Sequence, residues 1–297
     1  IAQETVSWMK SNKKKKRIAV TTDSIADLPE DILQKFDIVT IPHKVRTDSG
    51  TFKDGIEINT SGVLAYLKNT DKTMLPLSPD VSEHENFFAD QLTIANNVIH
   101  IAVSKDIENS GYESALEAAN SFENVTVVNS EHLSSGQGLM AAYASRLASA
   151  GMSIPDIIDR LEIMKKCTHT SFIVDTLDYL ARANQVSARR ANLVRAFMVR
   201  PVVVMKNGVM KIGRVYIGER ENSWKKYIDH CLATPHLNTT MIIVTYVGLT
   251  KKELEWIRKR IEKKVKFETI YFQEASPAIA VNCGPGTFGL LLFSDPE

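Results

Sequence analysis

A chain of 297 residues is long enough for about two domains, and its 44% hydrophobic and 24% charged residues are ordinary for a globular protein with a sizeable core. Its 36 basic and 35 acidic side chains nearly cancel, so no charge bias indicates nucleic acid or an anionic membrane as a partner. The longest apolar runs, such as residues 241–244 and 290–293, are far shorter than the ~20 residues of a membrane-spanning helix.

The three cysteines, Cys167, Cys231 and Cys283, are odd in number, far apart and outside any CxxC pair. They indicate neither a zinc site nor a disulfide scaffold, and they favour a reducing compartment. The N-terminus has no continuous apolar stretch typical of a secretory signal. We therefore expect a cytoplasmic protein. The seven histidines show no metal-ligand spacing, so no metal site is predicted.

The chain starts at Ile1 and carries a basic run, SNKKKKR, at residues 11–17. This run has two interpretations: an electrostatic tether to membrane or nucleic acid, or a solvated linker. We favour the linker, and we expect residues 1–16 to be a linker or tail that follows another domain of a longer chain.

Strand and helix signals alternate through the first half of the chain. Residues 18–21 and 38–45 have strand composition, and residues 29–36 between them read as a helix with Asp27 as its N-cap. The run 98–103 is the nearly continuous apolar type that parallel sheets bury on both faces. The remaining predicted helices are 60–68, 112–120, 136–150 and 157–166, with a strand at 125–128. This order predicts a doubly wound, mostly parallel sheet.

The second half has a different pattern, which predicts a mixed sheet with helices packed on it. Strand signals at 199–205 and 209–217 flank Asn207-Gly208 and predict a hairpin. The other predicted strands are 172–174, 240–246 and 267–271, with helices at 224–231 and 251–264. We place the boundary near residue 165, which divides the chain into an N-terminal α/β domain, 17–165, and a C-terminal α/β domain, 166–297.

In an open α/β sheet, ligands bind at the carboxyl ends of the strands, where loops supply backbone N–H groups. Four polar loops are candidates for such a site. They are residues 21–24, 72–76, 103–112 and 281–286. Capping and turn formation would explain each loop taken alone. Walker A, HExxH and GxSxG signatures are absent from the sequence, and the Ser-Gly-Gln-Gly run at 135–138 lacks the third glycine of a dinucleotide loop. The sequence therefore does not predict an enzyme.

Taken in order, these segments resemble the DegV family across residues 17–293. The matching positions are 20–24, 26–29, Pro42, 54–55, Thr73, Pro76, Ser104, 110–115, Ser130, 136–139, 177–180, 200–201, 207–208 and 284–286. The resemblance implies an EDD-type fold of two α/β domains and no cofactor. It also implies a tunnel between the domains that holds one long-chain fatty acid, whose carboxylate is presented to a fatty-acid kinase.

The resemblance also implies where the lipid head group would bind. Thr73 and Ser104 would contact it, and Gln185 and Asn282 stand where the family has an arginine and a histidine. Possible secondary contacts are Thr22, Asp23, Ser24, Ser110, Gly111, Gly284 and Gly286.

Replacing both cationic positions with neutral amides changes the expected ligand chemistry. A buried carboxylate without a cation tends to stay protonated, and loss of an arginine partner forfeits ~1.5–3 kcal/mol. We expect weaker binding, binding of the neutral acid, or a less acidic lipid, with Arg182 or Arg189 as candidates for compensation. Two alternatives stay open: a ligand-sensing or assembly module of a larger protein, and an acyl- or phosphate-handling enzyme that uses Asp23, Ser24 and the Gly-Pro-Gly loop.

Overall fold

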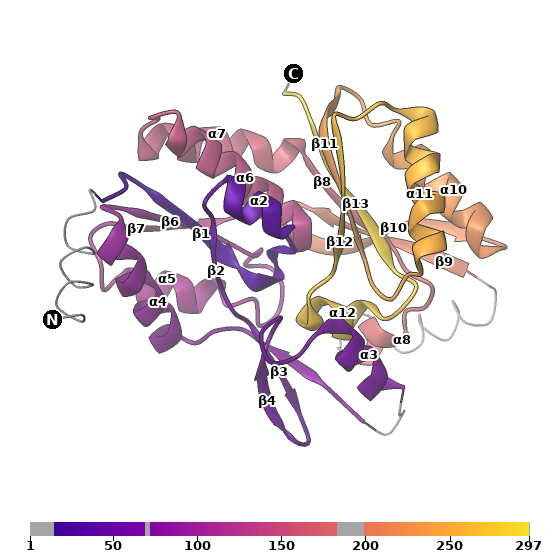
Figure 1. Ribbon diagram of the computed structural model, residues 1–297, viewed down its shortest axis with the longest axis horizontal. Coiled ribbons are helices and arrows are strands. Elements are labelled where there is room, and N and C mark those ends of the chain that lie inside the picture. The colour runs from indigo at the N-terminus through magenta and orange to yellow at the C-terminus, as the bar shows by residue number, and fades with distance from the viewer. Residues whose placement is uncertain (1–14, 69–71, 183–198, 297) are drawn as a thin grey trace, which may run out of the picture.

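The computed structural model describes residues 15–68, 72–182 and 199–296, which form two main β-sheets and one small sheet (Figure 1). The first sheet has the strand order β2-β1-β6-β7 and is parallel throughout. Its strands are β1 (Ala19–Asp23), β2 (Val39–Ile41), β6 (Val98–Ala102) and β7 (Val125–Asn129). The predicted parallel sheet is confirmed.

Helices cover both faces of the first sheet. One face packs against α4 (Val81–Ile94) and α5 (Tyr112–Ala119), and the other against α6 (Ser134–Ser149). The remaining elements of this half are the short 3₁₀ helix η1 (Ser24–Ala26), α2 (Glu30–Lys35) and α7 (Ile154–Cys167). Helix α4 has no counterpart among the predicted helices, although Asp80 and Glu83 form a capping box at its start.

The second sheet has six strands in the order β10-β9-β8-β13-β11-β12, and only β11 and β12 are parallel neighbours. Its elements are β8 (Thr168–Ile173), β9 (Val199–Lys206), β10 (Val209–Ile217), β11 (Leu237–Tyr246), β12 (Thr269–Glu274) and β13 (Phe288–Ser294), with α10 (Arg220–Cys231) and α11 (Lys251–Lys264). The predicted mixed sheet and the β9–β10 hairpin are confirmed. Asn207 and Gly208 turn the hairpin with positive φ angles of 52° and 78°.

A small antiparallel sheet, β4-β3-β5, projects from the first domain (Figure 1). Its strands are β3 (Lys44–Thr47), β4 (Gly50–Lys53) and β5 (Leu75–Leu77). The prediction of one strand over residues 38–45 was wrong, because β2 and β3 belong to different sheets. Pro42 lies between them, and its missing N–H prevents it from continuing a hydrogen-bonded ladder.

Asp27 does not cap the helix that follows it, as the sequence suggested. The N-cap of α2 is Pro29, and Asp27 ends η1 with a φ of 44°. Its carboxylate accepts hydrogen bonds from the Ser134 hydroxyl at 2.5 Å and from the Ser276 backbone N–H at 2.8 Å. Asp27 therefore joins the first domain to helix α12 (Pro277–Cys283), another helix that was not predicted.

Helix α6 packs between the two main sheets, and its apolar side chains belong to a core that includes residues of both. A Cβ atom on Gly136 would lie 1.8 Å from the Thr170 hydroxyl oxygen, and one on Gly138 would lie 2.5 Å from the Ala26 carbonyl oxygen. The two glycines thus permit helix α6 to approach β8 closely on one side and η1 on the other. Because α6 is shared, the division near residue 165 stays a prediction.

Three shorter helices surround the small sheet. Helices α3 (Thr60–Leu67) and α8 (Asp178–Arg182) both pack against α12. Residues 1–14 of the predicted linker lie outside the described residues, and Lys16 forms a β-bridge with Ala95. None of the helices in the described ranges is long and apolar enough to cross a membrane.

Candidate ligand cavity

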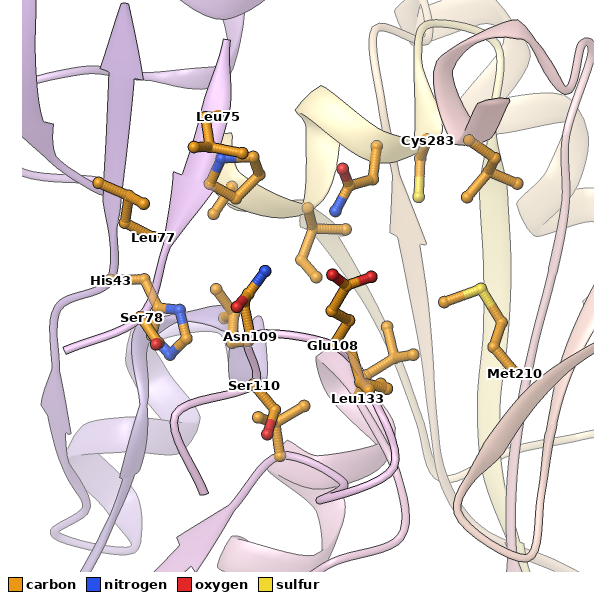
Figure 2. Close-up of a pocket in the computed structure, with 18 of the residues that line it drawn as sticks. His43, Leu75, Leu77, Ser78, Glu108, Asn109, Ser110, Leu133, Met210 and Cys283 are labelled. Carbon is orange, nitrogen blue, oxygen red and sulfur yellow. The ribbon is translucent and has the colours of Figure 1, made fainter. Parts of the chain in front are cut away.

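A cavity lies where the small sheet, helix α12 and the second sheet meet (Figure 2). It contains about 1050 Å³ of empty space, including the part open to solvent. Most of its lining is apolar, with contributions from Leu75, Leu133, Phe172, Met210 and Ile279. A cavity of this kind suits a ligand with a substantial apolar part.

A few polar side chains interrupt the apolar lining. The first domain contributes His43, Ser78, Glu108, Asn109 and Ser110, and α12 contributes Asn282 (Figure 2 labels the first five). A Cβ on Gly111 would lie 2.8 Å from the Cβ of Ser78, so the Ser78 side chain packs directly on the Ser110-Gly111 turn. These groups can fix the orientation of a ligand head group.

A second, smaller cavity adjoins the first; it spans about 340 Å³ of space between atoms, including the part open to solvent. Both are lined by Leu133, Phe172, Ile279 and Cys283. The smaller cavity reaches the second sheet at Thr245, Val247 and Leu291. Together the two cavities offer a path that starts among polar groups and continues into an apolar space between the sheets.

Of the three predicted head-group residues within the described ranges, one lines the cavity. Asn282 lines it, and its Oδ1 atom is buried without a hydrogen-bond partner in the described part of the chain. Thr73 is exposed and is not a lining residue. Ser104 is buried, and its hydroxyl donates to the Gly208 carbonyl at 2.7 Å. Gln185 lies outside the described residues.

The secondary contacts divide between the cavity and the surrounding framework. Ser110 lines the cavity and Gly111 follows it with a φ of 86°. A Cβ on Gly284 would lie 2.2 Å from the Tyr179 ring, and one on Gly286 would lie 2.5 Å from the Asp175 carboxylate. The Gly-Pro-Gly loop therefore permits close packing. Of the two arginines suggested as compensation, Arg189 lies outside the described residues and Arg182 ends α8.

The remaining predicted contacts belong to a buried network. Thr22 donates to the Ile101 carbonyl, and Ser24 donates to Asp54 at 2.8 Å. Asp23 accepts from Gln137 Nε2 at 2.6 Å and from the Val103 N–H at 3.1 Å. None of these three side chains lines the cavity, so their hydrogen bonds stabilise the elements around it and do not contact a ligand there.

His43 connects this network to the cavity. Its Nε2 lies 3.0 Å from Asp23 Oδ1, and the same side chain lines the cavity. Burial alone would raise the pKa of Asp23, but the hydrogen bond from His43 and the charge interactions with nearby histidines lower that pKa to about 2. Asp23 is therefore an ionised acceptor that fixes the His43 ring, with Nε2 occupied and Nδ1 left for other contacts.

Two buried carboxyl groups hold the start of α12, the helix that carries Asn282. Asp27 accepts from the Ser276 N–H, and Asp54 lies 3.4 Å from the Ala278 N–H. Burial raises the pKa of Asp27 to about 7, against the hydrogen bonds from Ser134 and Ser276, and repulsion from Asp54 adds to the rise. Burial also raises the pKa of Asp54. The position of α12 therefore depends on carboxyl groups that resist ionisation.

This arrangement predicts that Asp27 makes stability fall as pH rises. Between the unfolded pKa of 3.8 and the folded pKa of about 7, the folded state binds more protons at Asp27 than the unfolded state does. The stabilisation from Asp27 is complete below the unfolded pKa and is lost as the pH rises through the folded pKa. The free energy of unfolding changes by about 4 kcal/mol over this range. Asp27→Asn mimics the protonated side chain and should be the more stable protein at about pH 8.

Urea unfolding of both proteins at several pH values tests this. The comparison must be between variant and wild type, because burial lowers the pKa of His100 and of His132 to about 4 and gives them an opposite pH dependence. Replacement of the exposed Asp90 by Asn is the control and should leave the profile unchanged. Parallel profiles for wild type and Asp27→Asn would contradict the assignment.

Sequence reasoning missed several residues of the cavity, among them His43, Ser78 and Ile279. His43 was visible as a histidine next to Pro42 in an otherwise apolar strand pattern. Ser78 stands beyond the 72–76 loop that was singled out, and Ile279 belongs to the unpredicted helix α12. A polar residue within an apolar run was the available signal for His43.

The fold and the cavity define the class of this protein as a two-domain α/β protein with an apolar ligand cavity between its sheets. A family model described as "uncharacterised protein, DegV family" matches residues 17–295, and the chain belongs to that family. It is similar to a DegV domain-containing protein of Deinococcus radiodurans, with 24% identity over 281 residues, 93% of this chain and 98% of that protein.

Two solved structures have the same fold. A DegV family protein from Thermus thermophilus, described by its fatty-acid binding, has a TM-score of 0.83 and 23% identity, covering 94% of this chain and 100% of that chain. DegV from Bacillus subtilis, described as a fatty acid binding protein, has a TM-score of 0.79 and 25% identity, covering 95% and 100%.

Proposed function

We propose that the protein binds one long-chain fatty acid or a related lipid in the cavity between its sheets. The observation that carries this proposal is the apolar path from the polar groups His43, Ser78, Ser110 and Asn282 into the smaller cavity. Fatty-acid binding by the Bacillus subtilis and Thermus thermophilus proteins supports it. The proposed role is that of a carrier that presents the lipid to a partner such as a fatty-acid kinase, in the cytoplasm, without catalysis.

Native mass spectrometry of freshly purified protein tests the binding proposal directly. We expect a one-to-one adduct with the mass of a long-chain acid, which denaturing analysis then releases and identifies. Protein that stays empty after incubation with excess palmitate and stearate would overturn the proposal. Stoichiometric lipid that a fatty-acid kinase cannot phosphorylate would favour the alternative, a sensing or assembly module.

The cavity groups favour a neutral head group. Within the described lining, the ionisable side chains are His43, Glu108 and Cys283, and neither lysine nor arginine contributes. In the described part of the chain, the buried Asn282 Oδ1 is an acceptor without a hydrogen-bond partner. Such an acceptor, in a lining without lysine or arginine, suits the O–H of a protonated acid or of an uncharged lipid better than a carboxylate.

An enzyme that uses Asp23, Ser24 and the Gly-Pro-Gly loop is the weaker candidate. The Asp23 carboxylate is occupied by His43, Gln137 and Val103. The Ser24 hydroxyl donates to Asp54 and accepts from the His43 N–H at 3.0 Å. Hydrogen bonds that position loops account for both side chains.

Asn282→Arg should change the protonation state of the bound acid. In the wild-type protein, the carboxyl pKa of bound palmitic acid should lie above that of the free acid, since desolvation disfavours the charged form. An arginine supplies a charge-assisted bond of about 1.5–3 kcal/mol, so the bound pKa should fall below the free value and affinity at alkaline pH should rise by about tenfold or more.

Titration of carboxyl-labelled palmitate by carbon NMR measures both effects. Asn282→Leu is the matched control, because it removes the amide without adding charge, and its bound pKa should stay high. A depressed bound pKa in the wild-type protein would contradict binding of the neutral acid while leaving fatty-acid binding itself intact.

A further inference from the structure

Three imidazole rings gather around the Asp23 carboxylate in the core of the first domain, away from the lining of the ligand cavity except at His43. One ligand atom from each of Asp23, His84 and His100 lies within 4.8 Å of the others. Both His84 and His100 are 0% exposed, and Asp23 is 2% exposed. They belong to β1, α4 and β6, so the fold alone brings them together.

Two of these rings carry buried nitrogens that have no hydrogen-bond partner in the described part of the chain, His84 Nε2 and His100 Nε2. His84 Nδ1 lies 2.9 Å from the Asp80 carbonyl oxygen, which only accepts, so Nδ1 carries the hydrogen and Nε2 keeps its lone pair. His100 Nδ1 lies 3.0 Å from the Thr21 hydroxyl, which can accept from it and leave Nε2 with a lone pair. Buried polar atoms without partners are rare and require an explanation.

Two imidazole nitrogens and one carboxylate oxygen thus lie within 4.8 Å of one another in the core. A water molecule offers only two hydrogens to these three acceptors, whereas a metal ion accepts all three electron pairs. We propose that Asp23 Oδ1, His84 Nε2 and His100 Nε2 bind one divalent transition-metal ion of the zinc type, for which imidazole and carboxylate are established ligands. This site goes beyond the proposed lipid binding and is independent of it.

The surroundings of the three ligands fit this proposal. The Asp80 carbonyl fixes the tautomer and orientation of the His84 ring, as backbone carbonyls commonly do for metal-binding histidines. The second oxygen of Asp23 is held by Gln137 and by the Val103 N–H. Asp23 Oδ1 and His100 Nε2 lie 4.0 Å apart and the three ligand atoms lie within 4.8 Å of one another, whereas tetrahedral zinc places ligand atoms about 3.4 Å apart, so the side chains must move inward to bind the ion.

Full burial indicates a structural role rather than catalysis. The ion would connect helix α4 to strands β1 and β6, and His43 would bind the same carboxylate from the side of the cavity. Because the site is closed, exchange of the ion requires local opening, and metal must be introduced during refolding.

The test uses the full chain, unfolded in urea with EDTA and refolded with Co²⁺ or Zn²⁺. We expect one equivalent of Co²⁺ per chain after desalting, a visible absorption band of four- or five-coordinate cobalt with nitrogen and oxygen ligands, and a higher urea midpoint with Zn²⁺. His84→Phe and His100→Phe each remove one ligand. Because loss of an outer-shell partner already weakens metal binding about 10–100-fold, each should weaken Co²⁺ binding at least as much.

His230→Phe, which replaces an exposed histidine on α10, is the matched control and should keep the full equivalent of Co²⁺. Circular dichroism establishes whether each variant refolds. If one of the two ligand variants fails to refold, the other is sufficient for the test. Wild-type protein that retains no Co²⁺, or an equivalent that persists in a refolded His84→Phe or His100→Phe protein, would overturn the proposal and leave a buried water as the occupant.

Discussion

Ile279→Trp should abolish tight binding of long-chain fatty acids while leaving the fold intact. Ile279 lies on α12 and lines both cavities, so a larger side chain there would fill the passage between them. If it excludes the last four or so methylenes of palmitate, at ~0.8 kcal/mol each, the loss is about 3 kcal/mol, or roughly 200-fold in affinity.

The dependence on chain length makes this prediction specific. The shorter decanoate should bind wild-type and variant proteins with similar affinity, whereas palmitate and stearate should lose affinity in the variant. Calorimetry or competition with a fluorescent fatty acid gives the ratio. The urea midpoint is measured alongside, because a larger side chain in a packed site can itself cost about 1–3 kcal/mol.

Leu116→Trp is the matched control, since Leu116 is an exposed leucine on α5 that lines neither cavity. It should bind palmitate as the wild type does. Equal palmitate affinity in Ile279→Trp and wild type would mean that the acyl chain takes another path, even if the protein binds fatty acid.

The sequence predicted the two sheets because their strands carry a strong apolar signal. Residues 98–103 are apolar except for one histidine, and β6 is buried along its whole length. Helix α4 escaped prediction because two of its three buried residues, His84 and Gln91, are polar, which weakens the apolar period. Helix α12 escaped prediction for a different reason: it is short, and most of its residues are buried, so it shows no alternation of an apolar and a polar face.

The site was less predictable than the fold because its residues meet only through tertiary packing. Asn282 was a predicted head-group residue and does line the cavity, but no local pattern places it in the same cavity as Ser110. The histidine cluster shows the same limit. His84 and His100 have no metal-binding spacing in the sequence, and only the packing of α4 on β6 brings their rings within 5.7 Å, centroid to centroid.

Asp23 is the residue whose loss should cost the most stability. It is buried and accepts hydrogen bonds from three groups: the His43 ring, the Gln137 amide and the Val103 N–H. Asp23→Ala leaves all three donors without an acceptor in the core. Removing one partner of a buried charged network costs about 3–5 kcal/mol, and a stability of roughly 5–15 kcal/mol for a typical domain leaves little reserve.

Asp23→Asn separates the hydrogen bonds from the charge. The amide oxygen can still accept from Gln137 and Val103, and the amide nitrogen can donate to a His43 ring that changes tautomer, so the cost should be about 1–2 kcal/mol. The urea midpoint at constant m-value measures both losses. Equal losses in the two variants would show that charge, and not hydrogen bonding, dominates at Asp23.

The pH dependence offers an independent check on the same residue. The folded pKa of about 2 lies below the unfolded value of 3.8, so the stabilisation from Asp23 is present above the higher value and is lost as pH falls toward the lower one. Asp23→Asn should remove this acid dependence, whereas Asp27→Asn should remove the opposite dependence near neutral pH. Two buried aspartates four residues apart thus set opposite limits on the pH range of the fold: Asp23 as the ionised acceptor behind the cavity, Asp27 as the protonated group that holds α12.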